Sequence, residues 1–198
     1  MAIMKFIPEY ERRLDMNTFF NNELAMVVND NVRNFTELCL AAAPDYIFTD
    51  CPSSSSGKYH PADELDGNGC VIHTRRVVHM MNLIADGMDD FNHRDEAIAA
   101  CLIHDLRKQG IEKSGRTVSD HGDLAAALVM EVAVANPGII SDEQFEMIYN
   151  AVGCHYGPWA GGNWKMNNFH ADADVFCRLV HTADYLASRK EIGPKITF

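Results

Sequence analysis

Apolar residues recur along most of this chain at the three- and four-residue spacing that places them on one face of an α-helix. The clearest stretch runs from Val71 to Met88, where apolar positions keep this spacing until Gly87 offers a natural stop. No stretch alternates apolar and polar residues strongly enough to build a sheet. The pattern therefore predicts an all-α fold, with its main helices over residues 71–88, 94–106, 120–135, 141–155 and 173–190.

Residues at the expected helix ends support these boundaries. Ser119 or Asp120 can cap the third helix, which Asn136-Pro137-Gly138 ends. Ser141-Asp142-Glu143-Gln144 has the form of a capping box that opens the fourth helix. The second helix carries the adjacent pair His104-Asp105 at its buried end.

The earlier part of the chain is less regular. Two helices are predicted there, from Tyr10 to Asn29 and from Val32 to Ala43, with Pro44 ending the second. Serine, proline and glycine residues then deny regular structure to the stretch between Pro52 and Gly69. We expect one compact domain made of an N-terminal helical extension packed on the core (1–50), an active-site loop or linker (51–69) and a helical core (70–198).

Composition and charge narrow the class of protein. The 198 residues suit one domain, and 17 basic against 28 acidic residues give a net charge of −11. This charge opposes non-specific binding to long nucleic acid or to an anionic membrane, and favours a small substrate. The chain lacks a secretory signal pattern and an uninterrupted apolar stretch of membrane-spanning length, so we expect a cytoplasmic protein. Its six cysteines are scattered singly, which predicts reduced thiols in the core.

Side chains that can bind metal are concentrated in the later part of the chain. Four imidazoles and two carboxylates suit two neighbouring metal ions if one carboxylate bridges them. Each lies near the end or on the inward face of an expected helix, so that helices of a bundle can direct them to one point. These candidate ligands are His73, His104, Asp105, His121, His155 and Asp184.

The shared carboxylate and the remaining histidines can also be assigned from the sequence. Asp105 can bridge the two ions, with His73, His104 and Asp184 on one ion and His121 and His155 on the other. His79 follows His73 by six residues, hence about 240° round the helix, and should not face the same ion. His181 shares a helix face with Asp184 and can support it, whereas the other histidines (His60, His93 and His170) are interpreted as ordinary core or surface groups.

The order of these residues resembles the HD-domain superfamily of metal-dependent phosphohydrolases. The resemblance rests on five segments between Gly69 and Arg189: GCVIHTRRVV, ACLIHDLRKQG, DHGDLAAALV, AVGCHYGPW and LVHTADYLASR. It implies an all-helical fold and a binuclear metal centre held by the six candidate ligands. It also implies that Lys108, which completes His-Asp-x-x-Lys, lies near a substrate phosphate. The segment around His155 reads Cys-His-Tyr, which departs from the cyclic-dinucleotide phosphodiesterases of this superfamily, and their Gly-Tyr-Pro signature is absent.

These features predict an enzyme that cleaves a phosphoester of a small molecule, which we expect to be a nucleotide, with a hydroxide that bridges two divalent metal ions. Iron or manganese is expected because the ligands are nitrogen and oxygen, with cobalt, nickel or zinc as alternatives. Asp105 and Lys108 are the expected catalytic residues, and a homodimer is left open. The residues expected to contact substrate are Lys108, Lys58, Tyr59, Arg75 and Arg76.

Two other functions remain open from the sequence. Some proteins of the HD fold with a similar set of six ligands are di-iron oxygenases of polyols or phosphonates, and the ligands alone do not distinguish them from hydrolases. The third reading is a non-catalytic, nucleotide-binding regulator that has kept its metal site.

Overall fold

A computed structural model describes residues 18–159 and 171–192, and within these ranges it contains eight α-helices and no strand. The all-α prediction is therefore confirmed. The helices are α2 (Asn21–Leu24), α3 (Asp30–Ala42), α4 (Tyr46–Thr49), α5 (Gly69–Asp86), α6 (Arg94–Ile103), α7 (His121–Ala135), α8 (Asp142–Cys154) and α9 (Ala171–Ala187).

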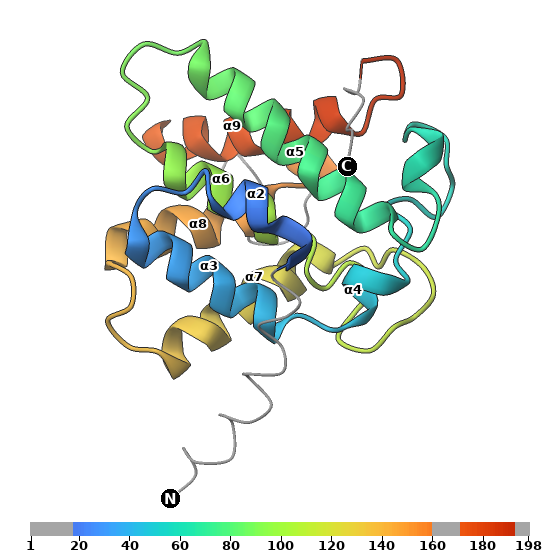
Figure 1. The fold of residues 1–198 in the computed structure, drawn as a ribbon, viewed down its shortest axis with the longest axis horizontal. Helices are drawn as coiled ribbons and strands as arrows, with labels where there is room; N and C mark the ends of the chain where they lie inside the picture. Colours follow the sequence, from blue (N-terminus) through green and yellow to red (C-terminus); the bar gives the residue numbers. More distant parts are fainter. Residues whose placement is uncertain (1–17, 160–170, 193–198) are drawn as a thin grey trace, which may run out of the picture.

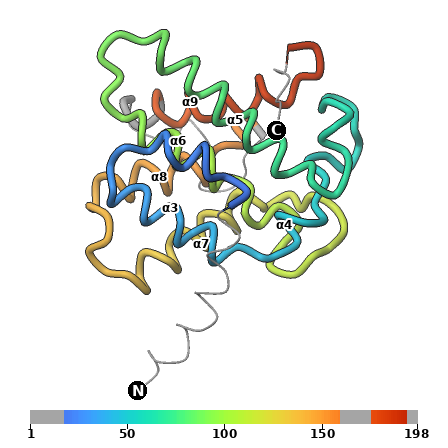
Figure 2. The backbone as a smooth tube through the Cα atoms, viewed as in Figure 1, coloured from blue at the N-terminus to red at the C-terminus, as the bar shows by residue number. Residues whose placement is uncertain are grey.

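The six longer helices form three pairs that lie one above another (Figure 1). Helices α5 and α9 make one outer pair, α3 and α7 make the other, and α6 with α8 lies between them. The backbone trace shows the same arrangement, with the short helix α4 at one side (Figure 2). Each outer pair therefore packs on the central pair, and the core runs through the middle of the molecule.

From Ala97 to Ile103, helix α6 is apolar on all sides, as expected for a helix that other helices surround. Every residue from Ala97 to Ile103 is at most 1% exposed, and the helix contacts α5, α8, α3 and α9. The helix ends directly before His104 and Asp105, and places this pair in the centre of the fold. Phe20, Phe35 and Phe48 belong to the same hydrophobic cluster, so the described N-terminal residues pack on these helices.

The predicted helices are confirmed from residue 69 onward, with ends that shift by a few residues. Ser141 caps α8 by accepting a hydrogen bond from the Gln144 N–H at 3.2 Å, as predicted. The Gln144 side chain makes other bonds than the return bond of a capping box: its Oε1 accepts from Ser141 Oγ at 3.2 Å, and its NH2 group donates to Glu96 at 2.8 Å. Asp120 stands at the start of α7, but its side chain caps no N–H group.

The helix predicted from Tyr10 to Asn29 is wrong in its last part, and residues 1–17 lie outside the described ranges. Only α2 is α-helical between residues 18 and 29. The Asn29 side chain instead accepts hydrogen bonds from the N–H groups of Asn31 and Val32, and so begins α3. The helix predicted from Val32 to Ala43 is confirmed, and it ends before Pro44.

Two further expectations are met by the described residues. All six cysteines lie within the described ranges, are buried and form no disulfide, which confirms the prediction of core thiols. None of the described helices combines the length and the hydropathy needed to cross a membrane. The division of the chain at residues 50 and 69 stays a prediction.

Candidate metal centre

Five helices bring the six candidate ligands to one place in the middle of the fold. His73 lies within α5, His104 and Asp105 follow α6, His121 begins α7, His155 follows α8, and Asp184 lies within α9. The four histidines are at most 2% exposed, and Asp105 is 4% exposed. The ligands therefore face the interior, as predicted from their positions on helix ends and inward faces.

One group of ligands gathers around the two carboxylates. His73 Nε2 lies 2.9 Å from Asp184 Oδ1, and His104 Nε2 lies 3.2 Å from Asp105 Oδ2. His104 Nε2 is also 3.9 Å from Asp184 Oδ1. These imidazole nitrogens and carboxylate oxygens are close enough to share one metal ion.

A second group uses the other oxygen of Asp105. His121 Nε2 and His155 Nε2 each lie 3.6 Å from Asp105 Oδ1 and 3.1 Å from one another. A Cβ atom at Gly122 would lie 2.8 Å from the Gly153 carbonyl oxygen, so this glycine allows α7 and α8 to approach closely enough for the contact. The two oxygens of Asp105 thus face different groups of ligands.

Hydrogen bonds to the backbone fix the orientation of three of the histidines. The Nδ1 atoms of His104, His121 and His155 lie 2.7, 2.8 and 2.6 Å from the carbonyl oxygens of Cys101, Val118 and Val152. A carbonyl only accepts, so Nδ1 carries the proton and donates, which leaves the Nε2 lone pair for a metal ion. In each case the Nε2 atom points into the cluster.

Buried polar atoms without partners support the same reading. His104 Nε2 and Asp105 Oδ1 are buried and find no hydrogen-bond partner among the described residues. An unsatisfied buried acceptor costs roughly 1–3 kcal/mol, and a charged one costs more. Both atoms face the other ligands, so bound cations would satisfy them and the residues fit a metal site.

The comparison with known families agrees with this geometry. The family model described as HD domain matches residues 70–189, which carry all six ligands. The chain belongs to the HD domain family. It is therefore a member of a superfamily of metal-dependent hydrolases, and the HD domain together with the His/Asp clusters indicates divalent metal binding. No curated protein and no solved structure matches the chain significantly.

The six candidate ligands form what we call the HD site. Neighbouring charges keep its two carboxylates, Asp105 and Asp184, ionised. Burial raises the pKa of Asp105, but Lys108 and His104 outweigh this effect and hold the pKa well below its ordinary value. Burial likewise opposes ionisation of Asp184, and His73 lowers its pKa through a hydrogen bond and its charge. The Lys108 ammonium is buried in direct contact with Asp105 Oδ2, and this contact raises the pKa of Lys108 against the effect of burial.

The histidines of the HD site differ in their affinity for protons. Burial lowers the pKa of His73, but the Glu64 charge and the Asp184 hydrogen bond outweigh burial and raise it to about 9. Burial and the neighbouring His155 lower the pKa of His121 to about 4. His121 is thus ready to bind metal at neutral pH, whereas His73 must first lose a proton.

We expect metal binding by this HD domain to weaken as the pH falls below about 9, because the metal competes with the proton on His73. Below that pH, the affinity for the metal ion bound by His73 should fall by about tenfold per pH unit. Titration of the apo-protein with Mn²⁺ at several pH values, by calorimetry in two buffers of different ionisation enthalpy, measures both affinity and proton release. An affinity that does not change between pH 6.5 and 9 would contradict the prediction.

A cavity of about 790 Å³ opens onto the HD site. Five of the six candidate ligands line it (His73, Asp105, His121, His155 and Asp184), and Lys108, which also lines it, lies next to Asp105. The outer wall is rich in hydroxyl groups, which come from the serine loop (Ser53–Ser56), Thr117, Ser119 and Ser188. This volume lies within the range of small-molecule sites.

The residues predicted to contact substrate fall into two sets. Lys108 and Tyr59 line the cavity. Lys58 does not line the cavity, and its Nζ atom lies 5.0 Å from the centre of the Tyr59 ring. Arg75 bonds to the Phe19 carbonyl at 2.6 Å, and Arg76 pairs with Asp63 and Glu64.

The positions of Arg75 and Arg76 correct the expectation that either faces the substrate. They follow His73 by two and three residues and so point about 200° and 300° round α5 from it. Packing against the N-terminal segment and the 51–69 loop then engages their guanidinium groups. Neither residue is kept as a substrate contact.

Two charged residues near the site were not predicted from the sequence: Glu64, which lies beside His73, and Arg189, which lines the cavity. Glu64 is completely buried beside His73 and His60, within a short 3-10 helix (Ala62–Glu64) that interrupts the stretch expected to be irregular. Arg189 lies over the rings of Tyr59 and Tyr185 at 4.4 and 4.2 Å. The i, i+4 spacing of His60 and Glu64 would bring the two side chains together on a helical turn. The serine, proline and glycine content of this stretch, however, predicts no helical turn there. Of the five histidines outside the ligand set, His60 and His181 line the cavity, His79 and His93 do not, and His170 lies outside the described residues.

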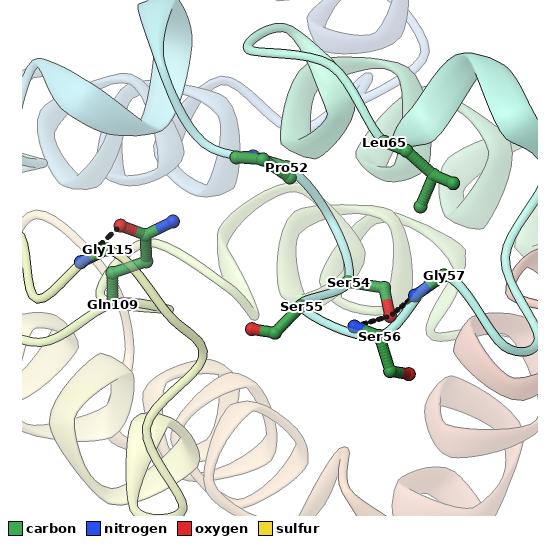
Figure 3. Close-up of a pocket in the computed structure, with 8 residues that line it drawn as sticks. All are labelled: Pro52, Ser54, Ser55, Ser56, Gly57, Leu65, Gln109 and Gly115. Atoms are coloured by element: carbon green, nitrogen blue, oxygen red, sulfur yellow. Dashed lines mark hydrogen bonds between the residues drawn. The ribbon is translucent and has the colours of Figure 1, made fainter.

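The serine loop separates the HD site from a second hollow of about 370 Å³. Figure 3 shows this hollow, with Gln109 and Gly115 on one side and Gly57 and Leu65 on the other. Ser54 Oγ accepts hydrogen bonds from the N–H groups of Ser56 and Gly57 and thereby shapes the turn. The Thr117 N–H donates to Ser55 Oγ at 2.9 Å, and the Lys190 N–H donates to the Tyr59 carbonyl at 2.9 Å. Residues 51–69 therefore form a wall of the site that is tied at both sides.

Proposed function

We propose that this protein is a metal-dependent phosphohydrolase that cleaves a phosphoester of a small molecule, a nucleotide in particular. The observation that carries the proposal is the position of Asp105. Its two oxygens face separate groups of histidines, and Lys108 stands beside it at the base of the cavity. This arrangement suits two cations and one phosphoryl group held side by side.

The metal content follows from the donor atoms. Six imidazole and carboxylate side chains, with no thiolate among them, favour two ions of iron or manganese, with cobalt, nickel or zinc as substitutes. When bound, such ions would supply an activated water at neutral pH and would withdraw charge from a phosphoryl oxygen. His104, His121 and His155 present Nε2 in a fixed direction through their backbone hydrogen bonds, so this part of the site needs little rearrangement.

Lys108 is the proposed phosphate contact inside the cavity. Its ammonium is buried and stays charged, because its pKa is raised. In the structure it pairs with Asp105, and cations on Asp105 would weaken that pairing by repulsion. Lys108 then turns its charge to the non-reacting oxygens of the phosphate, where an ammonium serves as a point charge.

The outer cavity suits the remainder of a nucleotide. Tyr59, Tyr156 and Tyr185 line it and are 47%, 40% and 39% exposed, so each offers part of a ring surface for stacking. Serine and threonine hydroxyls can bond to sugar hydroxyls. The net charge of −11 disfavours a long nucleic acid, so the proposed substrate is a small phosphorylated molecule.

Replacing Arg189 with alanine is expected to raise KM by roughly tenfold, the scale of one charged hydrogen bond, without changing the metal content. Arg189 lies at the cavity over Tyr59 and Tyr185, where its N–H groups can reach an anionic substrate. Steady-state kinetics and metal analysis of Arg189→Ala measure the two effects. Arg94→Ala is the matched control, because Arg94 pairs with Asp86 away from the cavity. An unchanged KM in Arg189→Ala would remove this residue from the substrate site.

The proposed function is tested by metal analysis of protein purified without added metal, followed by a panel of nucleotide phosphoesters with Mn²⁺ or Fe²⁺. The panel is assayed under reducing and under aerobic conditions. Release of phosphate or of a nucleoside monophosphate in both conditions supports hydrolysis. Substrate-dependent oxygen uptake, with a mixed-valent di-iron signal, would identify an oxygenase instead. Nucleotide binding without turnover at full metal loading would identify a regulator.

A further inference from the structure

We infer that Glu64 is a positioning residue for the metal centre. Its carboxylate holds His73 toward its metal ion and links the 51–69 loop to that ion. The inference rests on the proposed metal centre but not on the identity of the substrate. It concerns a carboxylate outside the six ligands and outside the segment 70–189 that the HD domain family model matches.

Glu64 is a buried charge at the junction of four other side chains. It is 0% exposed, and its Oε2 atom lies 2.7 Å from His60 Nδ1, 3.0 Å from Ser53 Oγ and 3.3 Å from His73 Nδ1. Its Oε1 atom accepts a hydrogen bond from Arg76 at 2.5 Å. Burial raises the pKa of Glu64, but the His73 charge and the hydrogen bonds from His60 and Arg76 outweigh burial and keep the carboxylate ionised.

His73 differs from the other three histidine ligands in what faces its second nitrogen. The others direct Nδ1 to a backbone carbonyl, whereas His73 Nδ1 faces the Glu64 carboxylate. The 3.3 Å contact is an ion pair rather than an aligned hydrogen bond, and Nε2 of the same ring points to Asp184. A carboxylate at the second nitrogen of a metal-binding histidine orients the ring and raises its basicity.

The backbone around Glu64 is built to keep this carboxylate in place. The Ser53 N–H donates to the Glu64 carbonyl at 2.9 Å, and the Cys70 N–H donates to the Cys51 carbonyl at 2.8 Å. A Cβ atom at Gly69 would lie only 1.9 Å from the Glu64 carbonyl oxygen, so the loop can sit here only against a glycine. His60 and Ser53 also line the cavity, so the same network links the cavity wall to His73.

The trio His60, Glu64 and His73 also meets the spacing of three ligands for one ion. Two observations favour a positioning role over a third metal ion. Both oxygens of Glu64 already accept hydrogen bonds, from Arg76 on one side and from Ser53 and His60 on the other. The Arg76 guanidinium also neutralises the carboxylate and would repel a further cation.

The test compares Glu64→Gln with Glu23→Gln. Glu23 lies 3.8 Å from Arg75, as Glu64 pairs with Arg76, but the described ion pair of Glu23 is with Arg75 and not with a ligand histidine, whereas Glu64 contacts His73. Apo-proteins are titrated with Mn²⁺ against a chelator, and Co²⁺-loaded proteins are compared by their visible absorption. For Glu64→Gln we expect one of two ions to bind roughly 10–100-fold more weakly, with a changed Co²⁺ spectrum, while the other ion is unaffected. Glu23→Gln should bind both ions as the unmodified protein does.

A second variant keeps the inference open to refutation if Glu64→Gln does not fold. His60→Gln removes the imidazole that contacts Glu64, and the His60 side chain is 15% exposed. We expect the affinity for the same ion to fall by several-fold, which is less than the roughly 10–100-fold loss in Glu64→Gln. Unchanged metal binding in both variants, or equal loss of both ions, would overturn the inference. Three bound ions in the unmodified protein and two in Glu64→Gln would also overturn it, because Glu64 would then be a ligand. If no phosphoester is cleaved but one ion is selectively weakened, the proposed function fails and the inference stands.

Discussion

Asp105→Asn is expected to lose both bound metal ions and at least roughly 10³-fold of the hydrolytic activity, because metal ions supply several kcal/mol of transition-state stabilisation. Among the residues that the structure describes, Asp105 is the carboxylate whose two oxygens face both groups of histidines. An amide keeps the size of the side chain but offers a single neutral oxygen. Metal content by mass spectrometry and kcat/KM on the best phosphoester substrate measure the effect.

The matched control for this variant is Asp50→Asn. Asp50 pairs with Lys113 at the surface as Asp105 pairs with Lys108 in the core, so both variants break an aspartate–lysine pair. Asp50→Asn should keep its metal and its activity, because exposed pairs contribute little. An Asp105→Asn protein that folds, retains two ions and retains its activity would contradict the assignment of Asp105 as the shared ligand.

The arrangement of the ligands could be predicted from the sequence because local rules determine most of it. Each ligand stands at a fixed place relative to an apolar helical pattern: His104 after a wholly buried helix, His121 at a helix start and Asp184 on an inward face. Apolar periodicity fixes the inward face of each helix, and burial of that face brings the side chains together. The structure adds the distances, and the separate use of the two Asp105 oxygens.

The parts that sequence reasoning missed depend on contacts between distant segments. Arg75 and Arg76 follow a ligand on the same helix. Their orientation is set by contacts with distant segments, since Arg75 bonds to Phe19 in the N-terminal segment and Arg76 bonds to Asp63 in the 51–69 loop. Glu64 lies in a stretch without apolar periodicity, so its burial does not follow from the periodicity that identified the helices. Its burial results from the path of residues 51–69 across the start of α5, where Gly69 permits the approach.

The site combines three histidines oriented by the backbone with one histidine oriented by side chains. Three histidines take their orientation from backbone carbonyls of the preceding helical or turn residues, so helix packing alone fixes them. His73 takes its orientation from side chains, namely Glu64 and Asp184. Changes in the 51–69 loop should therefore affect the ion at His73 before they affect the ion at His121 and His155.

Lys108→Gln is expected to keep both metal ions but to lower kcat/KM by about a hundredfold, the value of one buried charge-assisted hydrogen bond to substrate. Lys108 is buried, its pKa is raised, and it lies at the cavity beside Asp105. Glutamine can still donate a hydrogen bond to Asp105, but it carries no charge for a phosphate oxygen. Metal content should therefore separate this variant from Asp105→Asn, which is expected to lose its metal.

Lys113→Gln is the control for Lys108→Gln, because it removes a lysine of similar local sequence that pairs with Asp50 outside the cavity. It should leave kcat/KM unchanged. The loss in Lys108→Gln should persist across the neutral pH range, because the raised pKa of Lys108 keeps the ammonium charged there. If Lys108→Gln instead loses its metal, Lys108 acts through Asp105 and not on the substrate. Full activity with full metal content would remove Lys108 from the catalytic site.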